Sequence, residues 1–289
     1  MSPTAAGAGS RSGVRAPQRA RAENDPSNSI LPSLTPTPHR PILPAMHHIG
    51  ILAHSADGAA LCFLEMVRDS ARRLEEHHHP EITLSVLPMA PVLEAYDRNE
   101  LGAVRAHLAR TASRLANAGC DFFVCPDNTA HIALEADGAP LPLPGLHIAE
   151  IVAQRAKAEG RRCVGLVGTR WTMAGSVYPR ALARAGLAMK APPAEDREFV
   201  NDVIFGELCQ GVIRDESRAE YVRIIEGLKR AGCDVVALSC TEIPLLVTPE
   251  VSPLPTLDST RLLARAAVAV ACGGAGLPAW RGGSFAARR

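Results

Sequence analysis

The chain contains an internal repeat, and this repeat constrains the possible folds more than any other feature of the sequence. Residues 118–129 read AGCDFFVCPDNT and residues 231–242 read AGCDVVALSCTE, aligned without a gap. Ala-Gly-Cys-Asp is identical in both copies, and the apolar runs that follow agree in kind. Upstream, HHIGILA (47–53) matches RCVGLVG (162–168) in pattern at nearly the same offset. Two repeated features at nearly one offset indicate two related lobes.

Short apolar runs alternate with stretches of helical periodicity between residue 46 and about residue 272. The runs do not alternate strictly between apolar and polar residues, which is typical of strands buried on both faces of a parallel sheet. Two helical stretches end at Gly119 and Gly232. The sequence therefore predicts an α/β fold of two pseudo-symmetric lobes, each a parallel sheet flanked by helices, with the active site in the inter-lobe cleft. The expected strands are 47–53, 81–87, 121–125, 162–168 and 234–240.

The two ends of the chain differ from this pattern. Residues 1–45 are rich in Pro, Ser, Arg and Ala, and we expect a disordered N-terminal extension. Their Arg and Ser bias imitates a transit peptide, but a flexible extension or a true start at Met46 is the simpler interpretation. We assign residues 46–150 and 255–272 to lobe 1, residues 151–254 to lobe 2, and residues 273–289 to a flexible tail.

Charge and cysteine usage exclude several classes of protein. The formal net charge is +1, so no global field favours nucleic acid or an acidic membrane surface. No apolar run approaches the ~20 residues needed to cross a bilayer, so we expect a soluble, cytoplasmic protein. The eight cysteines form no CxxC pair, and no signal peptide is recognisable. We therefore expect reduced thiols, neither disulfides nor zinc ligands.

Asp127 and Cys240 occupy matching positions of the repeat, each at the end of an expected strand. Ligands of open parallel sheets bind beyond the carboxyl ends of the strands. If a pseudo-twofold axis relates the lobes, these two side chains face each other and supply one acid/base group to each face of a small substrate. The alternatives are an Asx-type turn for Asp127 and a buried strand-end cysteine for Cys240. Cys125 could substitute as the thiol, although a structural role is favoured, and His131 either tunes Asp127 or is structural.

Short polar side chains surround these two candidates and suit the binding of a carboxylate. Thr169 and Thr172 follow a strand of the second lobe, where a helix N-terminus could hold an anion. Ser55 is the corresponding candidate in the first lobe, and ordinary helix capping is the alternative in each case. The expected substrate-binding residues are Ser55, Asn128, Thr129, Thr169, Thr172, Thr241 and Glu242.

Metal and cofactor chemistry receive little support from the sequence. Adjacent histidines at 77–79 cannot all converge on one ion, so a solvated connection between a helix and a strand is predicted. None of the three lysines, Lys157, Lys190 and Lys229, lies in a strand-end loop beside a Gly-rich phosphate turn. A pyridoxal phosphate enzyme needs a Schiff-base lysine, so this class is set aside. GLVGT has too few glycines for a dinucleotide fingerprint.

Four segments resemble signatures of the aspartate/glutamate racemase family. They are CPDNTAH (125–131), SCTEIPLL (239–246), VGLVGTRWTMAGSVY (164–178) and LPTLDST (254–260), and the resemblance covers roughly residues 47–272. It implies two pseudo-symmetric α/β lobes, often assembled as dimers. It also implies that two cysteines flank the substrate Cα, one removing and one returning a proton, with no cofactor and no metal.

The chain departs from the pattern of that family at three places. Asp127 stands where the first catalytic cysteine belongs, Ala-His-Ser at 53–55 replaces a Gly-Gly-Met-type turn, and Leu263 replaces a histidine. We expect a cofactor-independent, racemase-like isomerase acting on a small acidic amino acid, aspartate or glutamate, and forming a homodimer. Cys240 is one acid/base, and Asp127 is the other or holds a water or ammonium group. The alternatives are a single-cysteine decarboxylase of malonate-type acids and a non-catalytic binding protein for a small carboxylate.

Overall fold

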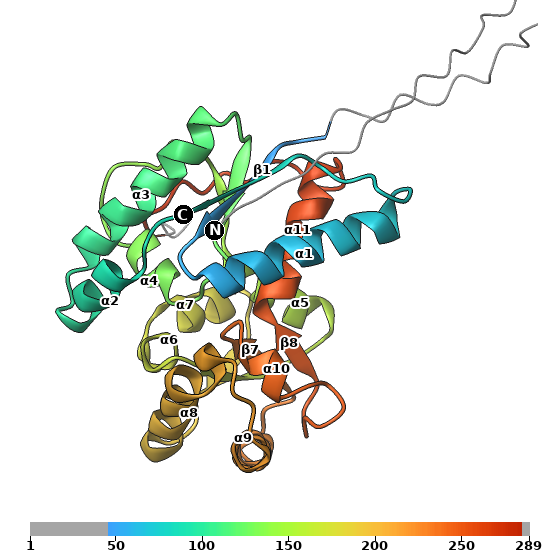
Figure 1. Ribbon diagram of the computed structural model, residues 1–289. Helices are drawn as coiled ribbons and strands as arrows, with labels where there is room; N and C mark the ends of the chain where they lie inside the picture. Colours follow the sequence, from blue (N-terminus) through green and yellow to red (C-terminus); the bar gives the residue numbers. More distant parts are fainter. Residues whose placement is uncertain (1–45, 285–289) are drawn as a thin grey trace, which may run out of the picture. The chain divides into compact units, whose positions relative to one another are not determined.

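The computed structural model of the protein describes residues 46–284 (Figure 1). Within this part of the chain, two four-stranded parallel sheets have the orders β2-β1-β3-β4 and β6-β5-β7-β8. The two orders are the same when each half is numbered from its own start. The predicted fold of two related α/β lobes is confirmed. The predictions for residues 1–45 and 285–289 lie outside the described residues.

Each lobe takes its strands from one half of the chain. The strands are β1 (Ile49–Ala53), β2 (Ile82–Val86), β3 (Phe122–Val124), β4 (Gly145–Leu146), β5 (Cys163–Gly168), β6 (Ala188–Lys190), β7 (Val235–Ser239) and β8 (Thr256–Asp258). The helices of the first half are α1 (Ala56–Arg73), α2 (Ala90–Asp97), α3 (Leu101–Asn117), α4 (Ala130–Leu134) and α5 (Ile148–Ala158). Those of the second half are α6 (Arg170–Ala174), α7 (Val177–Arg184), α8 (Ala194–Gly206), the 3₁₀ helix η1 (Leu208–Gln210), α9 (Asp215–Arg230), α10 (Ile243–Leu246) and α11 (Ser259–Ala271). Across residues 46–284, no helix is both long and apolar enough to span a membrane.

The repeated Ala-Gly-Cys-Asp segment forms the same turn in both lobes. Gly119 and Gly232 have φ angles of 85° and 96°, which glycine adopts without strain at the end of a helix. The Asp121 carboxylate accepts a hydrogen bond from the backbone N–H of His48 at 2.7 Å, just before β1. The Asp234 carboxylate likewise accepts a hydrogen bond from the backbone N–H of Cys163, the first residue of β5, at 3.2 Å. The repeat therefore ties the turn before β3 to β1, and the turn before β7 to β5.

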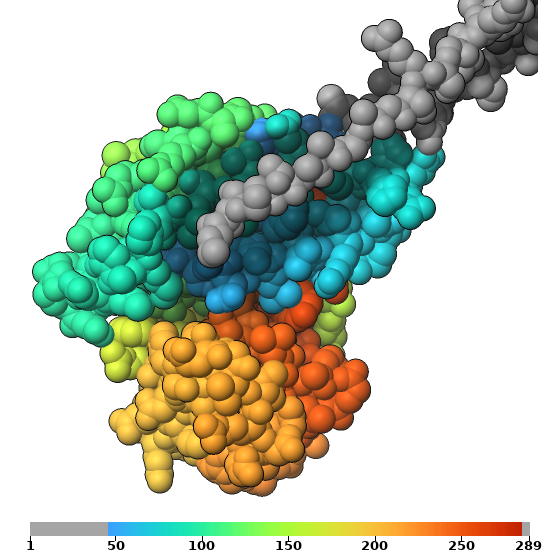
Figure 2. All heavy atoms as spheres, in the orientation of Figure 1, coloured from blue at the N-terminus to red at the C-terminus, as the bar shows by residue number. Residues whose placement is uncertain are grey.

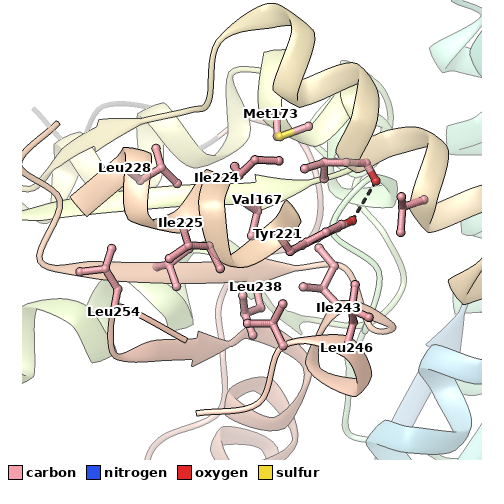
Figure 3. Packing of buried hydrophobic residues seen from close by; sticks show 14 of the residues in the cluster. Val167, Met173, Tyr221, Ile224, Ile225, Leu228, Leu238, Ile243, Leu246 and Leu254 are labelled. Atoms are coloured by element: carbon pink, nitrogen blue, oxygen red, sulfur yellow. Dashed lines mark hydrogen bonds between the residues drawn. The ribbon is translucent and has the colours of Figure 1, made fainter. Parts of the chain in front are cut away.

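The core of the second lobe lies between the central strands β5 and β7 and the helices α8 and α9 (Figure 3). All residues of β5 and β7 are buried, which explains why the two runs lack polar alternation. Tyr221 of α9 is fully buried, and its hydroxyl donates a hydrogen bond to the carbonyl of Val200 at 2.9 Å. This bond satisfies the polar group that burial of the tyrosine would otherwise leave unpaired.

The last helix of each half packs against the sheet of the other half. α5 follows β4 of the first sheet, but Ala149 and Val152 pack in one cluster with residues of β5. α11 follows β8 of the second sheet, but Leu263 and Ala267 pack with β1 and α1. β8 itself pairs with β7. The assignment of residues 255–272 to lobe 1 is therefore wrong for the strand 256–258, because the chain changes lobes between β8 and α11.

The segment after α11 returns to the first sheet. The N–H of Gly145 donates to the carbonyl of Trp280 at 2.7 Å, and the N–H of Leu141 donates to the carbonyl of Arg281 at 2.7 Å. Trp280 is only 8% exposed and packs against Phe123 of β3. The prediction of a flexible tail is therefore wrong for Trp280 and Arg281, which backbone hydrogen bonds and the buried tryptophan side chain anchor to the first sheet.

Candidate active site

A pocket lies where the carboxyl ends of the four central strands meet. His54 follows β1, Asp127 lies three residues after β3, Thr169 follows β5 and Cys240 follows β7, and all four side chains line the pocket. It holds about 530 Å³ of space, part of it open to solvent. On the face drawn in Figure 2, the blue and green first lobe meets the yellow and orange second lobe along one seam.

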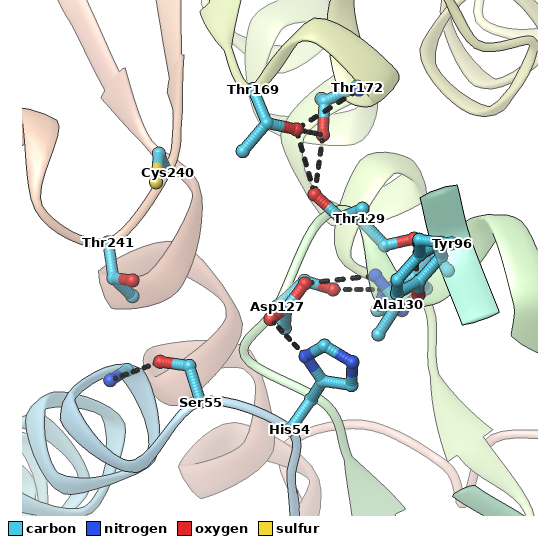
Figure 4. A network of polar contacts seen from close by, with 12 residues as sticks. His54, Ser55, Tyr96, Asp127, Thr129, Ala130, Thr169, Thr172, Cys240 and Thr241 are labelled. Carbon is cyan, nitrogen blue, oxygen red and sulfur yellow. Dashed lines mark hydrogen bonds and ion pairs between the residues drawn. The ribbon is translucent and has the colours of Figure 1, made fainter. Parts of the chain in front are cut away.

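The first lobe contributes a histidine–aspartate pair to the pocket (Figure 4). His54 Nδ1 lies 2.8 Å from Asp127 Oδ2, and Asp127 Oδ1 accepts a hydrogen bond from the N–H of Ala130 at 2.9 Å. Burial disfavours charge on both groups, but their mutual attraction and hydrogen bond outweigh it. The pKa of His54 is therefore raised and the pKa of Asp127 is lowered. Asp127 is an ionised carboxylate at neutral pH, and His54 is more easily protonated than an ordinary histidine.

The second lobe contributes a thiol held by a carboxylate. Cys240 Sγ lies 2.9 Å from Glu242 Oε2, and the hydroxyl of Thr241 donates to the same oxygen at 2.8 Å. Burial raises the pKa of Cys240 well above its ordinary value, and so do the charge of Glu242 and the hydrogen bond between the thiol and Glu242. The backbone N–H of Glu242 favours the thiolate but is outweighed. Cys240 is therefore a thiol at neutral pH.

Three threonine hydroxyls join the two lobes beside the pocket. Thr129 Oγ1 lies 2.9 Å from Thr169 Oγ1 and 3.2 Å from Thr172 Oγ1, and the last two are 3.1 Å apart. Thr169 also caps α6 by accepting a hydrogen bond from the N–H of Thr172 at 3.2 Å. Thr129 and Thr169 line the pocket, whereas Thr172 is absent from its lining. Thr172 supports the other two hydroxyls from behind.

Asn128 also lines the pocket, but its amide group is held by other side chains. Tyr178 donates its hydroxyl hydrogen to Asn128 Oδ1 at 2.6 Å, and Asn128 Nδ2 donates to Ser259 Oγ at 3.0 Å. Ser259 in turn donates to the carbonyl of Leu238 in β7 at 3.1 Å. These bonds connect the end of β3 to the second lobe, which favours a positioning role for the Asn128 side chain.

Ser55 and Thr241 bring the N-terminus of α1 close to the second lobe. Ser55 is the N-cap of α1 and accepts a hydrogen bond from the N–H of Gly58 at 3.0 Å. A Cβ atom added to Gly58 would lie 3.0 Å from Thr241 Cγ2 and 3.1 Å from the carbonyl oxygen of Pro126. The glycine therefore permits a close approach between the lobes at the pocket, which Ser55 and Thr241 both line.

His54 is the functional residue that sequence reasoning missed. The repeat contained a signal for it, because the offset that aligns β1 with β5 places His54 opposite Thr169. The pairing with Asp127 could not be recognised, since the two residues come from different strand ends.

Two other candidates near Asp127 are structural. Cys125 is fully buried in the first-lobe core and does not line the pocket, and burial raises its pKa well above the ordinary value. His131 Nδ1 donates to the carbonyl of Asp127 at 2.8 Å, and Nε2 accepts from the N–H of Ile148 at 3.3 Å. Burial lowers the pKa of His131 to about 3, so it is a neutral histidine that holds the loop in place.

The described part of the chain, residues 46–284, offers neither a metal-binding cluster nor a lysine in the pocket lining. No group of three or more His, Cys, Asp or Glu side chains there is arranged to hold a metal ion. His77 has a φ angle of 64° and lies in the turn between α1 and β2, away from the pocket residues. No lysine of this part of the chain lines the pocket.

The structure thus places two equivalent α/β lobes around one pocket, with a carboxylate and a thiol at equivalent strand ends. The sequence matches the profile of the Asp/Glu/hydantoin racemase family over residues 58–267. The chain belongs to this family, as its resemblance to the aspartate/glutamate racemase signatures indicates.

Individual relatives agree with this assignment. The chain is 24% identical over 225 residues to the broad specificity amino-acid racemase RacX of Bacillus subtilis, covering 76% of this chain and 96% of that protein. A candidate Asp/Glu racemase from Yersinia pestis has a similar structure, with a TM-score of 0.70 and 29% identity over 78% of this chain and 99% of that one. An aspartate racemase homologue from Pyrococcus horikoshii OT3 gives a TM-score of 0.66 and 25% identity, covering 78% and 99% of the two chains.

Proposed function

We propose that the protein is an isomerase that inverts the α-carbon of a free amino acid by two-base proton transfer, without pyridoxal phosphate. The single observation that carries the proposal is that Asp127, after β3 of the first lobe, and Cys240, after β7 of the second lobe, line the same pocket. Asp127 is an ionised carboxylate and Cys240 is a thiol. A two-base reaction needs one group that can accept the α-proton and one that can deliver a proton to the opposite face.

One turnover changes the protonation of both residues, and exchange of protons with solvent restores the starting form. Asp127 takes the α-proton of one enantiomer, and the thiol of Cys240 gives its proton to the other face of the planar intermediate. The inverted amino acid then leaves a protonated Asp127 and a Cys240 thiolate. This second form acts on the opposite enantiomer in the reverse sense, with the thiolate as base and the carboxylic acid as proton donor.

Neighbouring residues support both proton carriers. His54 stabilises the negative charge of Asp127 through the 2.8 Å contact. Glu242 accepts the hydrogen bond of the Cys240 thiol at 2.9 Å and holds the sulfur in place. Ser55 at the N-terminus of α1 and Thr169 are suited to the substrate carboxylate, because a helix N-terminus and hydroxyl groups both favour an anion.

Several expectations that follow from the resemblance stay predictions. Aspartate and glutamate are suggested as substrates by the names of relatives, and a cytoplasmic homodimer is the expected assembly. Size-exclusion chromatography with light scattering measures the assembly directly. The relatives described above are named as racemases, which supports an isomerase over a decarboxylase or a binding protein.

The test is α-proton exchange in deuterated water. The L- and D-forms of aspartate, glutamate, leucine and phenylalanine are incubated with the protein. Loss of the Cα–H signal is followed by NMR, and inversion is followed by chiral chromatography. Cys240→Ala is expected to lower the exchange rate about 100-fold or more, while Cys272→Ala, outside the pocket, leaves it unchanged. Undiminished exchange by Cys240→Ala, or no exchange by the wild type with any amino acid, overturns the proposal.

A further inference from the structure

The pocket has an apolar wall in addition to its polar residues. The aromatic rings of Tyr96 in α2, Trp171 in α6 and Phe205 in α8 form a continuous row. The ring centroids of Tyr96 and Trp171 are 5.8 Å apart, and those of Trp171 and Phe205 are 6.0 Å apart. Both lobes contribute to this row, since α2 belongs to the first lobe and α6 and α8 belong to the second. The wall is completed by Met89, Leu93 and Ile204.

The row of rings begins directly beside the proposed proton carrier of the first lobe. Tyr96 contacts the ring of His54 with a centroid distance of 5.8 Å, and His54 is bonded to Asp127. A substrate with its α-carbon between Asp127 and Cys240 therefore has an apolar surface within reach of its side chain. Tyr96 itself is buried, and its hydroxyl donates to the carbonyl of Thr129 at 3.3 Å. The wall is thus held in place by the same loop that carries Asp127.

The charges at the pocket disfavour an acidic side chain. Among the described residues, no lysine or arginine lines the pocket, whereas Asp127 and Glu242 both do. His54, which could carry a positive charge, already contacts Asp127. A second substrate carboxylate would enter a site with two protein carboxylates and no cation of its own. Burial of an anion without a cationic partner is strongly unfavourable.

Arg170 contacts the wall but does not supply that cation. Its guanidinium carbon lies 4.3 Å from the ring centroid of Trp171, and its Nη2 atom donates to Asp97 Oδ1 at 3.0 Å. The Arg170 side chain is 56% exposed and is not part of the pocket lining. Its charge is neutralised at the surface, and its stacking covers one face of the tryptophan.

We infer that the amino acid taken by this pocket carries an uncharged apolar or aromatic side chain, such as that of leucine, methionine or phenylalanine. This inference rests on the proposed isomerase function and names the substrate class of the same site. The side chain packs against Tyr96, Trp171 and Phe205 while the α-carbon lies between Asp127 and Cys240. Offset or edge-to-face contacts with the three rings favour aromatic side chains further.

The first experiment compares kcat/KM for α-proton exchange of leucine, methionine, phenylalanine, lysine, aspartate and glutamate. The apolar amino acids are expected to exceed aspartate and glutamate by about 100-fold, because a hydrophobic pocket without a cation cannot pair their second carboxylate. Faster exchange of aspartate, glutamate or lysine than of the three apolar amino acids overturns the inference.

Matched variants at Phe205 locate the preference in the wall. Phe205→Leu keeps the surface apolar and is expected to retain the preference for apolar amino acids. Phe205→Arg introduces a cation and is expected to shift the ratio of kcat/KM values toward glutamate by about 10-fold or more. Circular dichroism and urea unfolding confirm that each variant is folded. An unchanged ratio in a folded Phe205→Arg variant contradicts the assignment of this wall to the substrate side chain.

A binding measurement separates failure of the inference from failure of the proposed function. Phenylalanine and glutamate are tested for their ability to slow alkylation of Cys240 by iodoacetamide. Protection by phenylalanine without any α-proton exchange overturns the isomerase but keeps the apolar ligand class. Exchange and protection specific to glutamate keep the isomerase and overturn the apolar class. Neither exchange nor protection by any amino acid overturns both.

Discussion

His54 Nδ1 and Asp127 Oδ2 lie 2.8 Å apart, with 2% of the histidine side chain and 15% of the aspartate side chain exposed. The two residues follow different strands of the first sheet and meet only at its carboxyl edge. In the proposed reaction this pair supplies the acid/base group of the first lobe. His54 makes the carboxylate a weaker base but keeps it ionised over a wider pH range.

Substitutions of this pair are expected to affect exchange in different ways. Asp127→Asn removes the proton acceptor and should lower α-proton exchange by about 10²- to 10⁴-fold. His54→Gln keeps a side chain that can donate a hydrogen bond but removes the charge that lowers the pKa of Asp127. The acid limb of the kcat/KM profile should therefore move to higher pH in His54→Gln. A loss of rate with an unmoved acid limb would show that His54 is only structural.

Glu242 is expected to control the reactivity of Cys240. Its charge and hydrogen bond raise the pKa of the thiol, so Glu242→Gln should lower that pKa and increase the thiolate fraction at a given pH. Alkylation of Cys240 by iodoacetamide, followed by mass spectrometry of the Cys240 peptide between pH 7 and pH 9, should be faster in this variant. Glu250→Gln, far from the thiol in an exposed loop, is the control. Equal or slower alkylation in Glu242→Gln contradicts the assignment.

At Gly58 the helix α1 approaches Thr241 of the second lobe so closely that we expect the site not to tolerate an added methyl group. A Cβ there meets Ser55, Thr241 and the carbonyl of Pro126 within about 3 Å. Gly58→Ala should therefore lower the free energy of unfolding by about 1–3 kcal/mol and reduce exchange by pushing α1 away from the second lobe. Gly102→Ala in α3 has no heavy atom within 4 Å and should instead stabilise the protein by about 0.4–1 kcal/mol. Urea unfolding of both variants tests the contrast, and an equal effect of the two changes would refute it.

Because His131 is buried in its neutral form, we expect the free energy of unfolding to fall in mild acid. Its pKa is about 3 in the folded protein, against ~6.5 in an unfolded chain. Between these two pKa values the imidazole of residue 131 is protonated in the unfolded chain but neutral in the folded protein. The free energy of unfolding should therefore fall by about 1.4 kcal/mol for each pH unit below ~6.5 because of this residue. His131→Gln should flatten the dependence by that amount in urea titrations from pH 7 to pH 4.5.

The sequence by itself was sufficient for the positions of the main strands and for the equivalence of the two lobes. A strand buried on both faces needs an apolar residue at nearly every position, and this requirement is local. The Ala-Gly-Cys-Asp turn is equally local, because only the glycine tolerates its positive φ angle and the aspartate caps the neighbouring strand. Cys240, Asp127 and most of the polar residues around them could be proposed as site residues for the same reason, since each lies within a few residues after such a strand.

The tertiary structure alone decided which lobe each helix covers, how the chain after α11 returns and what charge each site residue carries. β8 and α11 are adjacent in sequence yet pack in different lobes, and Trp280 is buried only because the first sheet offers it a surface. The ionised Asp127 and the protonated Cys240 likewise depend on His54 and Glu242 at particular distances. Burial and pairing of charged groups are properties of the assembled environment, so no local pattern of residue types determines them.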